Sequence, residues 1–253
     1  MKNKTKTTFI FLIFASLLTT FSFQFLINKQ NKTESFEVSS TISNKIAYLT
    51  FDDGPSTNTE KILEILDKYN IKATFFVVGP EYKLKNDLLI KIVQSGHELA
   101  IHSYEHNYNY IYSSKENYLK DFYKCLNWIK SITGITPKIY RFPGGSSNTI
   151  ANKELIKSII QELNEQGFIH ADWNVDTLDS YCKDDYSKII KNALSSTKKN
   201  ENNNHYYQTI LMHDNKNKPS SIKALPILIE KFISYGYHFE VLKENSHIIK
   251  HIK

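Results

Sequence analysis

The chain contains few residues of the types that define several protein classes. Only two of its 253 residues are cysteines, Cys125 and Cys182, which is too few for a disulfide scaffold, and their spacing matches no metal-binding motif. The net charge is +6, but four of these charges come from lysines among the first thirty residues, which include no acid. The rest of the chain is close to neutral, which gives no support to nucleic-acid binding.

Arginine is almost absent. The 32 basic residues include a single arginine, Arg141, and all the others are lysines. A planar guanidinium can bind a carboxylate through two parallel hydrogen bonds, which an ammonium group cannot do. We therefore expect Arg141 to have a functional role, as the partner of Asp52 or of an aspartate after the fifth predicted strand.

Long hydrophobic runs are missing except near the N-terminus. There, an uncharged run at residues 7–28 follows three lysines and is long enough to cross a bilayer, which takes roughly 20 apolar residues. We expect residues 1–29 to be an uncleaved membrane anchor, with secretion after signal cleavage as the alternative. Positive charge before the span places the rest of the chain outside the cell. Residues 30–44 then form a polar linker, and residues 45–253 form one domain.

From residue 45 onward, apolar runs alternate with amphipathic stretches of helical spacing. The runs predict seven strands, at residues 46–51, 73–79, 98–102, 138–142, 169–175, 209–213 and 238–242. The stretches predict six helices, at residues 59–69, 87–95, 114–133, 152–166, 185–195 and 222–235. Such alternation predicts a parallel sheet, which at this length closes most naturally into a (β/α) barrel.

Polar side chains fall at the predicted C-terminal strand ends, where such folds carry their chemistry. They are Asp52 and Asp53 at the first strand, His102 at the third, Arg141 at the fourth, Asp176 and Asp179 after the fifth, and His213 at the sixth.

Two histidines four residues apart, His102 and His106, can bind one metal ion from a strand end. With Asp53 they make a three-ligand set that leaves positions open for water and substrate, which is typical of a catalytic site. The neighbouring carboxylate, Asp52, points in a different direction and stays available as a proton acceptor. Opposite such a base, His213 is a candidate general acid.

Five segments resemble, in order and approximate spacing, the motifs of the polysaccharide deacetylases, the NodB-homology or carbohydrate esterase family 4 domain. They are Thr50-Phe51-Asp52-Asp53-Gly54, His102-Ser103-x-x-His106, Arg141-Phe142-Pro143-Gly144-Gly145, the segment from Asp172 to Asp179, and Leu211-Met212-His213. The resemblance covers Lys45 to Leu242. It implies a distorted (β/α) barrel of about seven parallel strands.

The resemblance also implies a role for each matching residue. Asp52 is implied to be the catalytic base, oriented by Arg141, and His213 the acid, tuned by Asp179 or, as the alternative, by Asp176. A divalent metal, usually zinc, is implied on Asp53, His102 and His106. The positions implied to bind substrate are Leu211, which would line the acetyl pocket, and Gly144, Pro143, Trp173, Asp176 and Tyr181.

Two positions depart from the family pattern. After Asp179, members often have a Trp that forms a wall of the sugar groove, and we expect Tyr181 or Trp173 to replace it here. At Gly144 many members have an aromatic residue, so an oxyanion-stabilising N–H is retained while the side-chain contact is lost. Tyr108 and Tyr181 are among several tyrosines that either stack on a sugar or pack within the fold.

The implied activity is metal-assisted hydrolysis of N-acetyl groups on a glycan. A tethered extracellular domain with the Lys- and Asn-rich composition of an AT-rich bacterial genome meets peptidoglycan first, so we expect its N-acetylglucosamine residues to be the substrate of a monomeric enzyme. One alternative is an O-acetyl esterase acting on a xylan-type glycan. Another is a catalytically inactive, membrane-tethered glycan-binding protein on the same scaffold.

Overall fold

The computed structural model describes residues 45–79, 84–182, 185–216 and 218–252. These residues belong to one compact unit, Ser43–Lys253. The predicted anchor at residues 1–29 and linker at residues 30–44 lie outside the described residues and stay predictions. Within the described ranges, no helix combines the length and the apolar character needed to span a bilayer.

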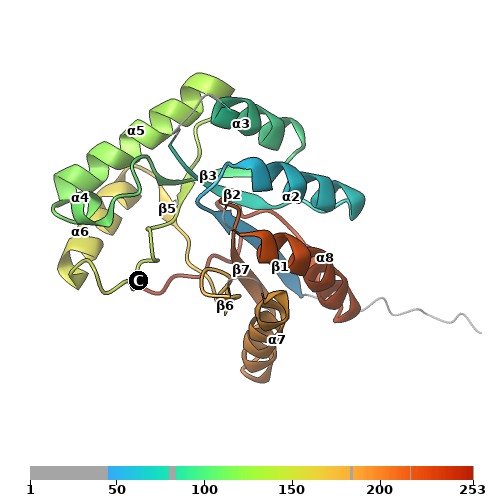
Figure 1. Ribbon diagram of the computed structural model, residues 1–253. Helices are drawn as coiled ribbons and strands as arrows, with labels where there is room; N and C mark the ends of the chain where they lie inside the picture. Colours follow the sequence, from blue (N-terminus) through green and yellow to red (C-terminus); the bar gives the residue numbers. More distant parts are fainter. Residues whose placement is uncertain (1–44, 80–83, 183–184, 217, 253) are drawn as a thin grey trace, which may run out of the picture. The chain divides into compact units, whose positions relative to one another are not determined.

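Eight parallel strands of the described chain form one sheet (Figure 1). They are β1 (Ile46–Asp52), β2 (Thr74–Val78), β3 (Glu98–Ser103), β4 (Ile139–Tyr140), β5 (Ile169–His170), β6 (Val175–Asp176), β7 (Tyr207–His213) and β8 (His238–Phe239). The order is β5-β4-β3-β2-β1-β7-β6, and β8 pairs with the first residues of β1. The prediction of a parallel α/β sheet is thus confirmed.

The helices cover this sheet in an order that follows the strands (Figure 1). They are α2 (Thr57–Lys68), α3 (Leu84–Gln94), α4 (Tyr108–Ile111), α5 (Lys115–Thr133), α6 (Lys153–Glu165), α7 (Tyr186–Asn202) and α8 (Pro219–Ser234). The long helices contact one another in the order α7-α8-α2-α3-α5-α6. Several begin at a side chain that accepts a backbone N–H, which satisfies a donor of the first turn: Ser56, Ser114, Asn152 and Asp185.

Alternation along the strands divides the side chains between two faces. On β1, Ala47, Leu49 and Phe51 belong to the large core under the helices, while Tyr48 belongs to a smaller cluster on the inner face. The other buried members of that inner cluster are Phe76, Ala100, Ile139, Ala171 and Leu242. Because the period is two, Asp52 shares the inner face with Tyr48, and the same counting places His102, Arg141 and His213 there.

The predicted barrel is confirmed only in part. The strand order of the described chain is open, with β5 and β6 at its two ends, but only residues 171–174 separate these two strands, so the sheet curls into a half-barrel. The C-terminal segment, residues 248–252, lies along β5 and the residues after it. Asp172 N–H donates to Ile249 O at 2.8 Å, and His251 N–H donates to Asp172 Oδ2 at 2.8 Å. His170 Nε2 lies 2.9 Å from Ile252 O. Backbone groups that a closed barrel would pair between strands are paired with this segment instead.

Most element boundaries differ from the predictions by a few residues, and two differences change the set of elements. The strand predicted at residues 169–175 is split into β5 and β6, because Asn174 turns toward β7 and exchanges hydrogen bonds with Thr209 at 3.2 and 2.8 Å. A short helix that was not predicted, α4, begins after Asn107, whose side chain accepts the N–H of Tyr110 at 3.3 Å. The two cysteines are both buried and unpaired.

Candidate active site

The single arginine is completely buried at the end of β4. Its Nη1 donates to Asp52 Oδ1 at 2.8 Å and to Thr50 Oγ1 at 2.9 Å. Its Nε donates to Ala171 O at 2.9 Å and its Nη2 to Asp172 O at 3.1 Å. Of the two predicted partners, Arg141 therefore binds the carboxylate of Asp52, and the segment after β5 contributes only backbone carbonyls. The planar guanidinium carries several N–H donors in fixed directions, so it reaches all four acceptors at once. The ammonium group of a lysine could not do so.

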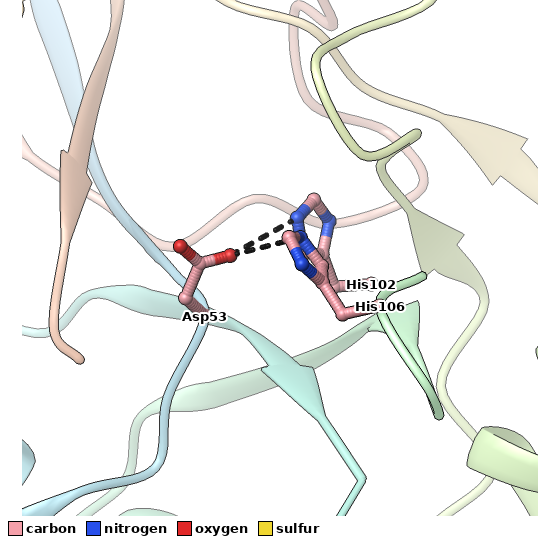
Figure 2. A group of neighbouring side chains, drawn as sticks. All are labelled: Asp53, His102 and His106. Carbon is pink, nitrogen blue, oxygen red and sulfur yellow. Dashed lines mark ion pairs between the residues drawn. The ribbon is translucent and has the colours of Figure 1, made fainter. Parts of the chain in front are cut away.

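The side chains of Asp53, His102 and His106 converge (Figure 2). Asp52 lies beside them, with its Oδ2 at 3.9 Å from His102 Nε2. Asp53 Oδ1 lies 3.5 Å from His102 Nε2 and 3.2 Å from His106 Nε2, and the potential ligand atoms all lie within 4.8 Å of one another. Asp53 and His106 have φ angles of 73° and 51°. Left-handed backbone at non-glycine residues is uncommon and costs energy, and such residues are enriched at active sites, although Asn70, Leu178 and Asn204 also adopt it here. The strain here coincides with two of the three predicted metal ligands.

The donor set of these three residues suits a divalent cation. His102 Nδ1 lies 2.9 Å from Arg141 O, so the hydrogen on Nδ1 leaves the lone pair of Nε2 directed at the site. Burial alone would raise the pKa of Asp53, but the adjacent imidazoles of His102 and His106 hold it well below its usual range. An ionised carboxylate with two imidazoles accepts zinc and other divalent transition metals.

His213 ends β7 and binds Asp179. Its Nδ1 lies 2.6 Å from Asp179 Oδ1, and its backbone N–H donates to Asp179 Oδ2 at 2.8 Å, where the Ser221 hydroxyl also donates at 2.6 Å. Burial lowers the pKa of His213, but the hydrogen bond that its imidazole donates to Asp179, together with the charges of Asp179, Asp53 and Asp52, raises the pKa to about 9. The alternative partner, Asp176, accepts the N–H of Leu178 at 2.8 Å instead. The imidazole is thus protonated at neutral pH.

The turn after Arg141 brings backbone close to the site. Gly144 has a φ of 76°, which glycine adopts without a steric penalty. The carbonyl of Pro143 accepts the Tyr112 hydroxyl at 2.7 Å, which ties this turn to the end of α4. Tyr108, the first residue of α4, lies beside Gly144, and burial raises the pKa of its hydroxyl to about 12.

The predicted wall residues differ in how firmly they are held. Leu211 is 5 % exposed and lies two residues before His213 on the inner face of β7. Trp173 packs at 5.1 Å against the ring of His251 and at 5.5 Å from the Arg141 guanidinium. Tyr181 is 82 % exposed. Of the two predicted replacements for the family Trp, only Trp173 is fixed by neighbours, while substrate contacts by either residue stay predictions.

Asp121, on α5, is a site residue that sequence reasoning missed. Its Oδ2 accepts the Ser103 hydroxyl at 2.6 Å and the Tyr104 N–H at 2.8 Å, and its Oδ1 accepts the Glu105 N–H at 2.7 Å. The Ser103 hydroxyl in turn accepts the N–H of His106 at 2.9 Å. One buried carboxylate thus fixes the loop between the two histidines. Asp121 could have been noticed because it lies on the buried face of α5, at a position where the helical spacing predicts an apolar residue.

Sequence reasoning also missed the two residues that directly follow His213, Asp214 and Asn215. Asn215 Nδ2 donates to Asp53 Oδ2 at 3.1 Å and so orients a predicted metal ligand. Asp214 is buried, accepts the Thr59 hydroxyl at 2.5 Å, and has its pKa raised by burial to about 7. Its carboxyl lies against Gly54: a Cβ there would stand 2.0 Å from Asp214 Oδ2. Apart from their position next to His213, nothing in the pattern of the chain marks either residue for its role.

Comparison with known proteins agrees with this geometry. A family model described as polysaccharide deacetylase matches residues 39–162. The chain is 32% identical to the putative polysaccharide deacetylase YheN of Bacillus subtilis, over 80% of this chain and 69% of that protein. It is 35% identical to a peptidoglycan-N-acetylglucosamine deacetylase of Bacillus cereus, over 80% and 71%. The catalytic domain of a peptidoglycan N-acetylglucosamine deacetylase from Eubacterium rectale superposes with a TM-score of 0.75 at 34% identity, over 82% of this chain and 93% of that one.

Proposed function

Because the chain belongs to the polysaccharide deacetylase family, we propose that it hydrolyses the N-acetyl groups of N-acetylglucosamine residues in peptidoglycan and releases acetate. The names of the relatives from Bacillus cereus and Eubacterium rectale support this choice of substrate. The observation that carries the proposal is a pair of residues suited to proton transfer on adjacent strands, Asp52 and His213. Asp52 is bound to Arg141, and His213 is bound to Asp179. Both lie beside the cluster of Asp53, His102 and His106.

The proposed cofactor is a divalent cation, with zinc as the preferred metal, held by Asp53, His102 and His106. When bound, such a cation supplies Lewis acidity toward the acetamide carbonyl and lowers the pKa of water to ~7.

Asp52 is the proposed general base. Arg141 binds its Oδ1, while its Oδ2 lies 3.9 Å from His102 Nε2, on the side of the metal-ligand cluster. Oδ2 is thus positioned to take the proton from the attacking water as the water oxygen bonds to the acetyl carbon. The backbone N–H of Gly144 is the proposed donor to the negative charge that develops on the carbonyl oxygen.

His213 is the proposed general acid. Its Nδ1 is bound to Asp179, so the proton to be transferred sits on Nε2. As the carbon–nitrogen bond breaks, Nε2 gives this proton to the departing nitrogen, which leaves as the sugar amine while the acetyl group leaves as acetate. The raised pKa of His213 keeps the donor protonated at neutral pH.

The test is acetate release by the full-length chain from N-acetylated peptidoglycan and chito-oligosaccharides. We expect release to stop on chelation, to return with zinc, and to be lost in Asp52→Asn but kept in Asp185→Asn, which removes an exposed carboxylate at the start of α7. Release from O-acetylated glycans alone would favour an esterase. Metal binding without turnover on any glycan would favour a binding protein.

We further propose that the domain is held outside the cell by an anchor at residues 1–29 and acts as a monomer. The apolar run in the sequence supports this location. β1 begins at Ile46 and ends at Asp52, so the site lies at the far end of this strand from the point where the described chain begins. Membrane fractionation with protease digestion of intact cells tests the location. Recovery of intact protein in the soluble cytoplasmic fraction would contradict it.

A further inference from the structure

Tyr108 stands between a predicted metal ligand and the Gly144 turn. Its ring centroid lies 5.4 Å from that of His106, with the two planes at 85°. A Cβ placed on Gly144 would lie 3.4 Å from Tyr108 Cε1 and 3.5 Å from its hydroxyl oxygen. The end of the Tyr108 side chain therefore occupies the space next to the backbone that is proposed to stabilise the oxyanion.

The ring of Tyr108 is held by its neighbours. It packs at 6.0 Å against Tyr112, which stacks at 6.0 Å on Tyr118 in α5. The hydroxyl of Tyr112 donates to Pro143 O at 2.7 Å, which fastens the end of α4 to the residue before Gly144. Rigid placement of a polar group lowers the entropic cost of using it to bind a ligand.

The hydroxyl of Tyr108 is available for such a ligand. Across the described residues it has no hydrogen-bond partner, whereas the hydroxyls of Tyr112 and Tyr123 each have one. The side chain is only partly exposed. Buried tyrosines usually pair their hydroxyls, although those of Tyr118 and Tyr140, which are enclosed in the core, have no partner either. By contrast, Tyr181 is largely in solvent and is not fixed in this way.

We propose that Tyr108 is a substrate-binding residue whose hydroxyl donates a hydrogen bond to the N-acetyl sugar bound at the cluster of Asp53, His102 and His106. Its ring forms the wall of the site that Gly144, without a side chain, does not provide. This inference rests on the proposed function and adds a contact that the metal ligands and the acid–base pair do not supply.

The test compares Tyr108→Phe with Tyr110→Phe in the full-length chain. Tyr110 lies in the same short helix but lines a depression with Lys120 and Lys124, whose lining includes none of the proposed metal ligands. Loss of one hydrogen bond to substrate is expected to lower kcat/KM on chito-oligosaccharides about tenfold in Tyr108→Phe. Tyr110→Phe should stay within twofold of wild type, and both variants should keep the wild-type zinc affinity and Tm.

A binding measurement separates this inference from the proposed function. In the inactive Asp52→Asn background, adding Tyr108→Phe is expected to weaken calorimetric binding of a chito-oligosaccharide about tenfold, while adding Tyr110→Phe is not. If the wild type is active and the two phenylalanine variants match in both turnover and binding, the inference about Tyr108 is overturned alone. A wild type that neither binds nor deacetylates these glycans would overturn the proposed function, and this inference with it.

Discussion

Replacing Asp121 by asparagine is expected to weaken metal binding, although Asp121 is not one of the proposed ligands. Its carboxylate accepts three hydrogen bonds, at 2.6, 2.8 and 2.7 Å, from the loop that joins His102 to His106. An amide keeps one oxygen and presents an NH2 group to the donors at the other position, so at least one bond is lost. A hydrogen bond to a charged group contributes about 1.5–3 kcal/mol. If that restraint orients the histidines, zinc affinity falls about 10- to 100-fold, the range seen for groups that orient metal ligands.

The assay is zinc affinity by competition with a chromophoric chelator, together with Tm and circular dichroism. Asp185→Asn is the matched control, because asparagine caps a helix as well as aspartate does. Ser103→Ala removes only one of the three bonds and should give a smaller loss, so it keeps the test open if Asp121→Asn does not fold. A folded Asp121→Asn protein with zinc affinity within twofold of the control would refute the reasoning.

Two further predictions concern the acid and the first strand end. Asp179→Asn removes the charge and the charged hydrogen-bond partner that contribute most to raising the pKa of His213 to about 9, while burial, which lowers this pKa, and the charges of Asp53 and Asp52, which raise it, remain. His213 acts as an acid only below its pKa, and a bound cation also lowers that pKa. In the wild type, kcat is therefore expected to fall on the alkaline side at or below about pH 9. In Asp179→Asn this fall should occur at lower pH, and a pH profile of kcat that does not move would contradict the role of Asp179. Gly54→Ala puts a methyl group 2.0 Å from Asp214 Oδ2 and should destabilise the fold by about 1–3 kcal/mol, with an unchanged Tm as the contrary result.

The sequence predicted the parallel sheet but not how it ends. Apolar runs alternating with amphipathic stretches are local patterns, and each one predicts an element without knowledge of the rest. Closure depends instead on contacts between distant segments. Asp172 pairs with Ile249 and His251 through backbone and carboxylate hydrogen bonds, and neither residue lies in a pattern that marks it as a partner of β5. The split of the predicted fifth strand has the same cause, since Asn174 bonds to Thr209 on β7.

The site could be predicted where residue type itself carries the chemistry. Asp53, His102 and His106 are recognisable as candidate metal ligands by their types and spacing, and Arg141 as a candidate site residue by its isolation among lysines. Asp121 and Asn215 act only by holding other groups, through hydrogen bonds to backbone N–H groups and to Asp53. Such contacts have no characteristic spacing along the chain, so only the folded arrangement reveals them.

The relative placement of the proposed base and acid follows from strand register. In the pairing of β1 with β7, Asp52 stands opposite His213 and Thr50 opposite Leu211. Neighbouring strands lie about 4.8 Å apart, and residues two positions apart on a strand share a face. The two proton-transfer groups therefore form one row of the inner face, and the predicted acetyl-pocket residue lies in the row before it. A slip of one residue in this pairing would turn His213 to the helix-covered face while Asp52 stayed inside. The hydrogen bond from Asp214 N–H to Asp52 O, at 3.1 Å, continues the same register past the strand end. The separation of base and acid is thus set by backbone pairing, and the side chains that bind Asp52 and His213 only adjust their orientation and charge.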